Sequence, residues 1–302
     1  MKKQRQMPLF SLNEDSASDT DTEGKKMGSY HPGNTLNDLT GKEWIKFTRS
    51  WFVCNPKPRK ESEILHPAKF PEEMIEQFIE FFTKKGQTVL DPFLGSGSTL
   101  VACNNTLRRG YGVELSTYWA EIARKRTLTR RITEPGLSQT VIVGDSRELD
   151  KIAEQHSLPK FDFCITSPPY GNILRTSRGG VESAQRKRAK SGLPEYYSED
   201  PRDLGNLEST EEYIDNLFLV FSKVKELLRL GSYIVVVIQN ARTPEGDNAP
   251  LAWEIALRLK EIFTLKQERI WCQDNKPLGI WGYPKEYVSN VHHHYCLILK
   301  ND

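Results

Sequence analysis

The sequence predicts an α/β protein built on a doubly wound, mostly parallel sheet. Helix and strand signals alternate from Pro71 to the end of the 302-residue chain, as in sheets whose strands are joined by helical crossovers. Residues 233–238 form a continuous β-branched and apolar run, which is typical of a strand buried on both faces. Loops rich in glycine or proline follow two of the strands, where ligands bind in such sheets.

Individual elements follow from apolar spacing and capping residues. Pro71 suits the first turn of a helix, and Ser116 is placed to cap a later one. Ser209 and Glu212 form a capping box before a long amphipathic helix that we expect to end at Gly231. We expect seven strands, over residues 88–91, 111–114, 140–143, 161–166, 233–238, 265–271 and 292–299.

We expect two regions along the chain. Residues 1–38 are predicted to be a disordered tail, because five acids lie among Ser, Thr and Ala between residues 14 and 23 without apolar periodicity. Residues 39–302 are predicted to form one domain. No apolar run approaches the roughly 18 residues of a membrane span, and no signal-peptide pattern is present, so we expect neither a membrane nor a secreted location.

Charge and cysteine content exclude some classes of protein. The 42 Lys and Arg nearly balance the 40 Asp and Glu, so any surface for nucleic acid must be local. The five cysteines form no CxxC pair, which argues against zinc or disulfide frameworks and fits a cytoplasmic location. The histidines at positions 292–294 are adjacent on an expected strand, where neighbouring side chains point to opposite faces. We therefore expect no metal.

The first loop after a strand, residues 91–99, has the properties of a ligand loop. Gly95 and Gly97 allow the backbone to approach a ligand closely, and the following helix offers free N–H groups. The loop matches neither the Walker A nor the GxGxxG pattern, so a tight turn without a ligand is the alternative. Two further strands end in the acids Glu114 and Asp145, which could hold the ribose hydroxyls and the adenine amino group of a nucleoside.

The fourth strand ends in the turn Ser167, Pro168, Pro169 and Tyr170. Two successive prolines cannot donate to a sheet, so the strand must stop there. Carbonyl oxygens at the turn could accept the two hydrogens of an amino group and localise its lone pair, and Tyr170 could stack on a base turned out of the duplex. A proline-rich turn without function is the alternative.

These residues resemble the amino-group DNA methyltransferases, which modify N4 of cytosine or N6 of adenine. Residues 91–97 are similar to motif I of that family, residues 167–170 to the catalytic motif IV, and residues 66–71 to motif X, in the order X, I, IV. The resemblance covers roughly residues 44–302. It implies a seven-stranded Rossmann-like sheet of the class I S-adenosylmethionine-dependent type and S-adenosylmethionine as cofactor.

The resemblance also implies the residues of the site. Those expected around the cofactor are His66, Pro67, Asp91, Pro92, Phe93, Gly95, Gly97, Ser98, Thr99, Glu114, Leu115, Asp145 and Ser146. Those expected at the reacting amine are Ser167, Pro168, Pro169 and Tyr170.

The reaction expected from the resemblance is site-specific methylation of N4 of cytosine, since Ser at the first position of motif IV leans that way within the family. N6 of adenine is the alternative, and an RNA or protein amide methyltransferase or an inactive cofactor-binding subunit are further ones. Methylation of cytosine carbon needs a cysteine after a proline, and the chain contains no Pro-Cys pair. Cys164, inside the fourth strand, is expected to be a core thiol.

The partner expected is double-stranded DNA, in the nucleoid of the cytoplasm, with a role in restriction–modification. Residues 171–208 form a predicted insertion that contacts it. Residues 172–192 carry a net charge of +5, which suits phosphate binding, although a solvated charge run is the alternative. The cations proposed to bind DNA are Arg175, Arg178, Arg186, Lys187, Arg188 and Lys190. The loops at residues 240–248 and 274–286, and also Asp203 and Asn206, could reach DNA.

A short segment in the tail suggests a second partner. Residues Gln6, Met7, Pro8, Leu9 and Phe10 resemble the pentapeptide that binds bacterial sliding clamps. A predicted disordered tail would present such a peptide, although five residues match by chance often and a bland apolar tail is the alternative.

Overall fold

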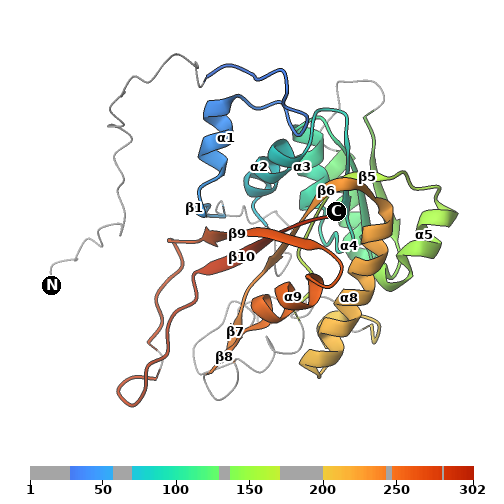
Figure 1. Cartoon of the computed structure of the whole chain (residues 1–302). Helices are drawn as coiled ribbons and strands as arrows, with labels where there is room; N and C mark the ends of the chain where they lie inside the picture. Colours follow the sequence, from blue (N-terminus) through green and yellow to red (C-terminus); the bar gives the residue numbers. More distant parts are fainter. Residues whose placement is uncertain (1–27, 57–69, 129–136, 171–199, 243–246, 281) are drawn as a thin grey trace.

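The computed structural model describes residues 28–56, 70–128, 137–170, 200–242, 247–280 and 282–302. Within them, one sheet of eight strands has the order β1-β9-β10-β6-β5-β2-β3-β4 (Figure 1). Its strands are β1 (Trp51–Val53), β2 (Thr88–Asp91), β3 (Arg109–Glu114), β4 (Gln139–Val143), β5 (Phe161–Thr166), β6 (Leu228–Ile238), β9 (Thr264–Cys272) and β10 (His293–Lys300). A separate hairpin pairs β7 (Ala241–Arg242) with β8 (Asn248–Ala249).

The helices alternate with these strands. They are α1 (Gly41–Phe47), α2 (Glu72–Phe82), α3 (Ser98–Asn105), α4 (Thr117–Leu128), α5 (Leu149–Gln155), α8 (Thr210–Leu227) and α9 (Leu251–Leu259), with the short 3₁₀ turns η1 (Ser146–Glu148) and η2 (Leu204–Asn206). In the part of the chain that the structure describes, no helix is long and apolar enough to cross a bilayer.

The pairing of the strands confirms the predicted doubly wound, mostly parallel sheet. Strand β10 is antiparallel to both β6 and β9, whereas the other pairs in the sheet are parallel. The carboxyl ends of β2, β3, β4, β5, β6 and β9 therefore lie along one edge, which we call the carboxyl edge. The expected number of strands in the sheet is wrong by one, because β1 adds to β9 and its three residues are too few to show a periodic pattern.

Two layers of helices cover the sheet. One core cluster joins residues of α1, α2 and α3 to the sheet, and the other joins residues of α5, α8 and α9. Along β6 the side chains alternate between them: Ile234 and Val236 belong to one cluster, and Val235 and Val237 to the other. Burial on both faces explains why this strand is apolar throughout rather than alternating.

Two expected boundaries need correction. Helix α8 ends at Leu227, and Gly231 lies inside β6 with a positive φ of 82°. Order also begins before residue 39, since Asn37 is fully buried and donates from Nδ2 to the carbonyl of Phe81 at 2.6 Å. Residues 28–38 therefore pack on α2, whereas residues 1–27 lie outside the described part.

The structure also shows the surroundings of Cys164 and of the adjacent histidines on β10. Cys164 is completely buried in β5, as expected of a core thiol. His294 stacks on Trp271 with ring centroids 4.5 Å apart, whereas His293 contacts Tyr295 edge-on. Neighbouring histidines on β10 thus have different ring partners.

Candidate functional site

Asp91 ends β2 at the carboxyl edge and joins two strands and a helix. Its Oδ1 accepts from Thr166 Oγ1 at the end of β5 (2.6 Å) and from the backbone N–H of Phe93 (3.0 Å). Its Oδ2 accepts from Thr99 Oγ1 on α3 (2.6 Å). Burial raises the pKa of Asp91, and these three donors oppose the rise. The carboxylate therefore fixes the glycine loop against the start of the Ser167 turn.

The loop after Asp91 packs tightly onto helix α4. Gly97, the N-cap of α3, has a φ of 85°, and a Cβ atom there would lie 2.8 Å from the Cβ of Ala123. Only glycine fits such a position. Gly97 provides no side-chain cap for α3, and the buried Ser98 Oγ has no hydrogen-bond partner among the described residues. The first turn of α3 can therefore bind an anionic group such as a carboxylate.

Glu114 ends β3 directly beside this loop. Its Oε2 accepts from the backbone N–H of Gly95 (2.7 Å), and its Oε1 accepts from that of Ser116 (2.9 Å). Burial raises the pKa of Glu114 to about 7, despite these two donors. Each oxygen keeps a second lone pair for a ligand hydroxyl.

Asp145 follows β4 and caps η1. Its Oδ2 accepts from Arg147 Nη2 at 2.7 Å, and its Oδ1 accepts from Arg147 Nε at 3.1 Å. Burial alone would raise the pKa of Asp145, but the hydrogen bonds and charge of Arg147 outweigh it, so the pKa lies below its usual range. Asp145 is thus an ionised acceptor held in one orientation.

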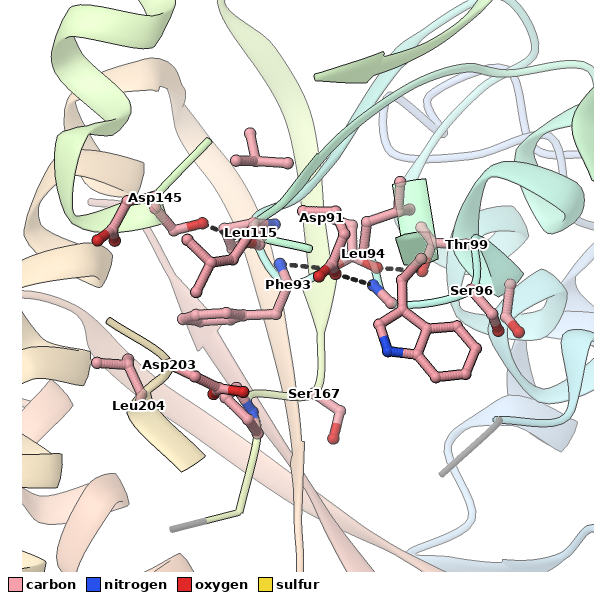
Figure 2. Close-up of a pocket in the computed structure, with 18 of the residues that line it drawn as sticks. Asp91, Phe93, Leu94, Ser96, Thr99, Leu115, Asp145, Ser167, Asp203 and Leu204 are labelled. Atoms are coloured by element: carbon pink, nitrogen blue, oxygen red, sulfur yellow. Dashed lines mark hydrogen bonds between the residues drawn. The ribbon is translucent and has the colours of Figure 1, made fainter. Parts of the chain in front are cut away.

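One pocket of about 920 Å³, part of it open to solvent, joins these strand ends (Figure 2). The predicted residues that line it are Asp91, Pro92, Phe93, Gly95, Ser98, Thr99, Glu114, Leu115, Asp145, Ser146, Ser167 and Pro169. The glycine loop and the Ser167 turn therefore face the same cavity.

The Ser167 turn continues from β5 across this cavity. Tyr213 of α8 donates from its hydroxyl to the carbonyl of Pro169 at 2.7 Å, which anchors the turn. Pro168 is buried next to it, and no described residue donates a hydrogen bond to its carbonyl. Burial raises the pKa of the Tyr170 hydroxyl, whereas the nearby Ser167 side chain and Gln239 backbone oppose the rise.

The structure does not bring every expected residue to the pocket. Gly97, Pro168 and Tyr170 are adjacent to lining residues but do not line it themselves. His66 and Pro67, the tail residues 6–10 and all six cations expected to bind DNA lie outside the described residues.

The pocket also has lining residues that the sequence did not assign to it. They are Phe70, Leu94, Ser96, Val113, Trp119, Arg202, Asp203 and Leu204. Phe70 belongs to the stretch similar to motif X, and Trp119 is a buried residue of α4. Asp203 was considered only as a contact to DNA, because it follows the basic stretch. A long insertion separates it from Tyr170, so spacing gave no signal of its place.

Comparison with known proteins supports the family. A model of the DNA methylase family matches residues 5–125. The type II methyltransferase M.BglI of Bacillus subtilis is 31% identical over 135 residues, which is 43% of this chain and 34% of that protein. The type II methyltransferase M2.DpnII of Streptococcus pneumoniae is 43% identical over 102 residues, 34% of this chain and 37% of that protein.

These matches cover only part of each curated relative. The chain matches about a third of the length of these curated relatives. A solved structure of an S-adenosylmethionine-dependent methyltransferase from Methanosarcina mazei superposes with a TM-score of 0.42 at 14% identity, covering 79% of this chain and 98% of that one. The family match includes the glycine loop and Glu114, and it confirms the resemblance to amino-group DNA methyltransferases there. It also supports S-adenosylmethionine as the cofactor. The Ser167 turn lies beyond residue 125, so its role depends on the geometry of the pocket.

Proposed function

We propose that this protein methylates an exocyclic amino group of a base in double-stranded DNA, at N4 of cytosine, with S-adenosylmethionine as the methyl donor. One observation carries the proposal: the glycine loop and the Ser167 turn line one continuous pocket. A donor bound by the first and an amine bound by the second would meet inside it. Relatives named type II methyltransferases support a role in restriction–modification.

The residues of the pocket fit this cofactor. The uncapped first turn of α3, with the unpartnered Ser98 hydroxyl, suits the carboxylate of its methionine part. Glu114 would accept from the ribose hydroxyls, and Asp145 from the adenine amino group. The Phe93 side chain projects into the same cavity (Figure 2), where it can contact the nucleoside. When bound, the cofactor supplies an electrophilic methyl group.

The Ser167 turn supplies what the amine needs. The Ser167 side chain and the Pro168 carbonyl would accept the two amine hydrogens, which concentrates the nitrogen lone pair toward the methyl group. The anchor from Tyr213 to Pro169 keeps these acceptors in place. Cysteine is not needed as a nucleophile, and the thiol nearest in sequence, Cys164, is buried with its pKa raised well above normal. In a single displacement the nitrogen would gain the methyl group as the carbon–sulfur bond breaks, S-adenosylhomocysteine would leave as a neutral thioether, and the extra amine proton would pass to solvent.

The choice of cytosine over adenine depends on the first residue of the turn. Ser167 has a hydroxyl where the adenine-modifying enzymes of the resembled family tend to have a carboxylate. We therefore propose N4 of cytosine as the target, with N6 of adenine as the competing base within the same chemistry.

The carboxyl edge also provides the surface for DNA. The segment after β9, described over residues 273–280 and 282–292, leaves the sheet at this edge and projects away from the body (Figure 1). It exposes Leu278, Ile280, Tyr283 and Tyr287, each at least two-thirds exposed. Apolar and aromatic side chains of this kind can insert between bases next to a turned-out nucleotide. The basic residues predicted to bind phosphates follow the Ser167 turn in the sequence and lie outside the described residues.

The proposal is tested by offering the protein cofactor with an isotopically labelled methyl group together with duplex DNA, RNA or bulk protein. We expect label in duplex DNA alone, and nucleoside mass spectrometry should find it as N4-methylcytosine. Label in RNA or protein would show that the substrate is RNA or protein and not DNA. Binding of cofactor without transfer to any of the three would indicate the inactive-subunit alternative.

A further inference from the structure

The cofactor pocket has a second wall, formed by residues 202–204. This segment lies between β5 and α8, and all three of its residues line the pocket. In the view of Figure 2, Asp203 lies below the Phe93 ring and between Asp145 and Ser167, whereas Asp91 lies above it. The acid therefore faces the cavity from the side opposite the glycine loop.

The position of Asp203 is fixed by its own segment. Its side chain is 7% exposed and caps η2, with Oδ1 accepting from the backbone N–H of Gly205 at 2.8 Å. Gly205 in turn packs on the Ser167 turn, since a Cβ atom there would lie 3.4 Å from the Cβ of Pro169. Asp203 is thus held next to the turn that we propose binds the amine.

Asp203 and Glu114 interact through the pocket. Burial is the main cause of the raised pKa of Glu114, its two backbone donors oppose the rise, and the negative charge of Asp203 adds to it. The cation that lines the pocket beside them, Arg202, pairs with Asp200 at 2.6 Å. Two carboxylates that face one cavity favour a ligand that carries positive charge.

We propose that Asp203 is a cofactor-binding residue that, together with Glu114, recognises the positively charged sulfonium half of S-adenosylmethionine. The inference rests on the proposed cofactor. After methyl transfer the sulfonium becomes a neutral thioether, so the product S-adenosylhomocysteine loses this attraction. Asp203 would therefore favour the substrate form of the cofactor over the product form.

The test compares Asp203→Asn with Asp215→Asn. Asparagine caps a helix about as well as aspartate, so Asp203→Asn removes the charge and keeps the cap on Gly205. Asp215 lies on the following helix α8, pairs with Arg258 at 3.1 Å and does not line the pocket, which makes it the matched control. Titration calorimetry with each ligand and thermal unfolding are measured for both variants and for the unchanged protein.

For Asp203→Asn we expect S-adenosylmethionine to bind about tenfold more weakly and S-adenosylhomocysteine to lose less than about threefold, with the melting temperature unchanged. The pH dependence of binding should also move to lower pH, because the pKa of Glu114 falls when the neighbouring charge is removed. Asp215→Asn should bind both ligands normally.

Two results would overturn the inference. Unchanged affinity for both ligands would show that Asp203 does not contact the cofactor, and equal losses for both would reduce it to a structural cap. Failure of the unchanged protein to bind either ligand would be a different outcome, because it contradicts the proposed cofactor itself.

Discussion

At the scale of single residues, the site is a set of acids whose surroundings differ. Asp91 is enclosed by three donors and holds the loop, whereas Asp145 is kept ionised by Arg147. Glu114 is buried with only two backbone donors, so its pKa is raised to about 7. The same side-chain chemistry therefore gives a structural anchor, a fixed acceptor and a group that titrates near neutral pH.

Ser167→Ala should reduce methyl transfer by roughly 10²-fold or more, because a hydrogen-bond acceptor for the reacting amine is lost. Cofactor affinity should stay within about twofold, since no bond to the cofactor is removed. Single-turnover transfer to duplex DNA and calorimetric binding of the cofactor measure the two effects. Ser222→Ala on α8, whose hydroxyl bonds its own helix at Phe218, is the matched control. An unchanged transfer rate in Ser167→Ala would refute the role of the turn.

Cofactor affinity should increase as pH rises through about 7, because Glu114 must be ionised to attract a cationic ligand and accept from its hydroxyls. The stability of the ligand-free protein should change in the opposite direction. The folded pKa lies above the ordinary value of 4.5, so the ionisation of Glu114 removes stability between pH 4.5 and about 7. Glu114→Gln should bind weakly and lose this pH dependence. A wild-type affinity that is flat across neutral pH would contradict the assignment.

At the scale of elements, the carboxyl edge is made by chain turns that few residues can form. The turn into α3 needs glycine at position 97, because φ is positive and Ala123 touches the loop. The Ser167 turn needs the anchor from Tyr213, which comes from a helix 44 residues further along the chain. The edge thus depends on both local backbone chemistry and packing between distant elements.

Gly97→Ala should be more destabilising than Gly86→Ala, although both glycines have a positive φ. Each substitution costs about 1 kcal/mol or more for the left-handed backbone. At Gly97 the new Cβ also meets the backbone of Ala123 at 2.9 Å, whereas at Gly86 nothing lies within 4 Å. We expect an additional loss of about 1–3 kcal/mol and weaker cofactor binding, measured by urea unfolding and calorimetry. Equal losses at the two positions would contradict the close packing of the loop on α4.

Most of the strands and helices could be predicted from the sequence. The alternation of helix and strand signals and the β-branched run of β6 predicted the sheet. The acids at the ends of β2 and β3 indicated which edge of the sheet binds a ligand. The end of α8 was not predicted, because Gly231 looked like a helix stop but occupies a left-handed position inside a strand. A glycine with positive φ has the same sequence signal in both settings.

At the scale of the whole molecule, one buried cation helps to hold residues 28–56 on the sheet. Arg269 of β9 is 4% exposed and lies 4.0 Å from the ring centroid of Phe47, 4.5 Å from that of Phe52 and 5.5 Å from that of Phe78. Its Nε also donates to the carbonyl of Arg49 at 2.9 Å. Burial lowers the pKa of Arg269 to about 10.

Arg269→Ala should lower the free energy of unfolding by about 2–4 kcal/mol, because it removes the cation–π contacts and leaves a cavity between α1, α2 and β9. Arg269→Met, which fills similar space without a buried charge, should lose less. Urea unfolding of both variants measures the difference. A loss below about 0.5 kcal/mol in Arg269→Ala would show that this segment does not depend on the cation.

Contacts between residues far apart in the chain could not be predicted from the sequence. Strand β1 has only three residues, and its pairing with β9 joins positions more than 200 residues apart. Asp203 reaches the pocket because η2 packs beneath the Ser167 turn, and no spacing rule connects it to the glycine loop. Local pattern specifies the strand ends, but which distant side chains complete the pocket is decided by tertiary packing.

The most direct test of the proposed chemistry is the position of the transferred methyl group. Duplex DNA incubated with the protein and a cofactor whose methyl group carries deuterium is digested, and its nucleosides are separated by mass spectrometry. Label on an exocyclic nitrogen, at N4 of deoxycytidine, is the predicted result; label at N6 of deoxyadenosine would keep the chemistry and change the base. Label on the cytosine ring carbon, or none in DNA at all, would contradict the account.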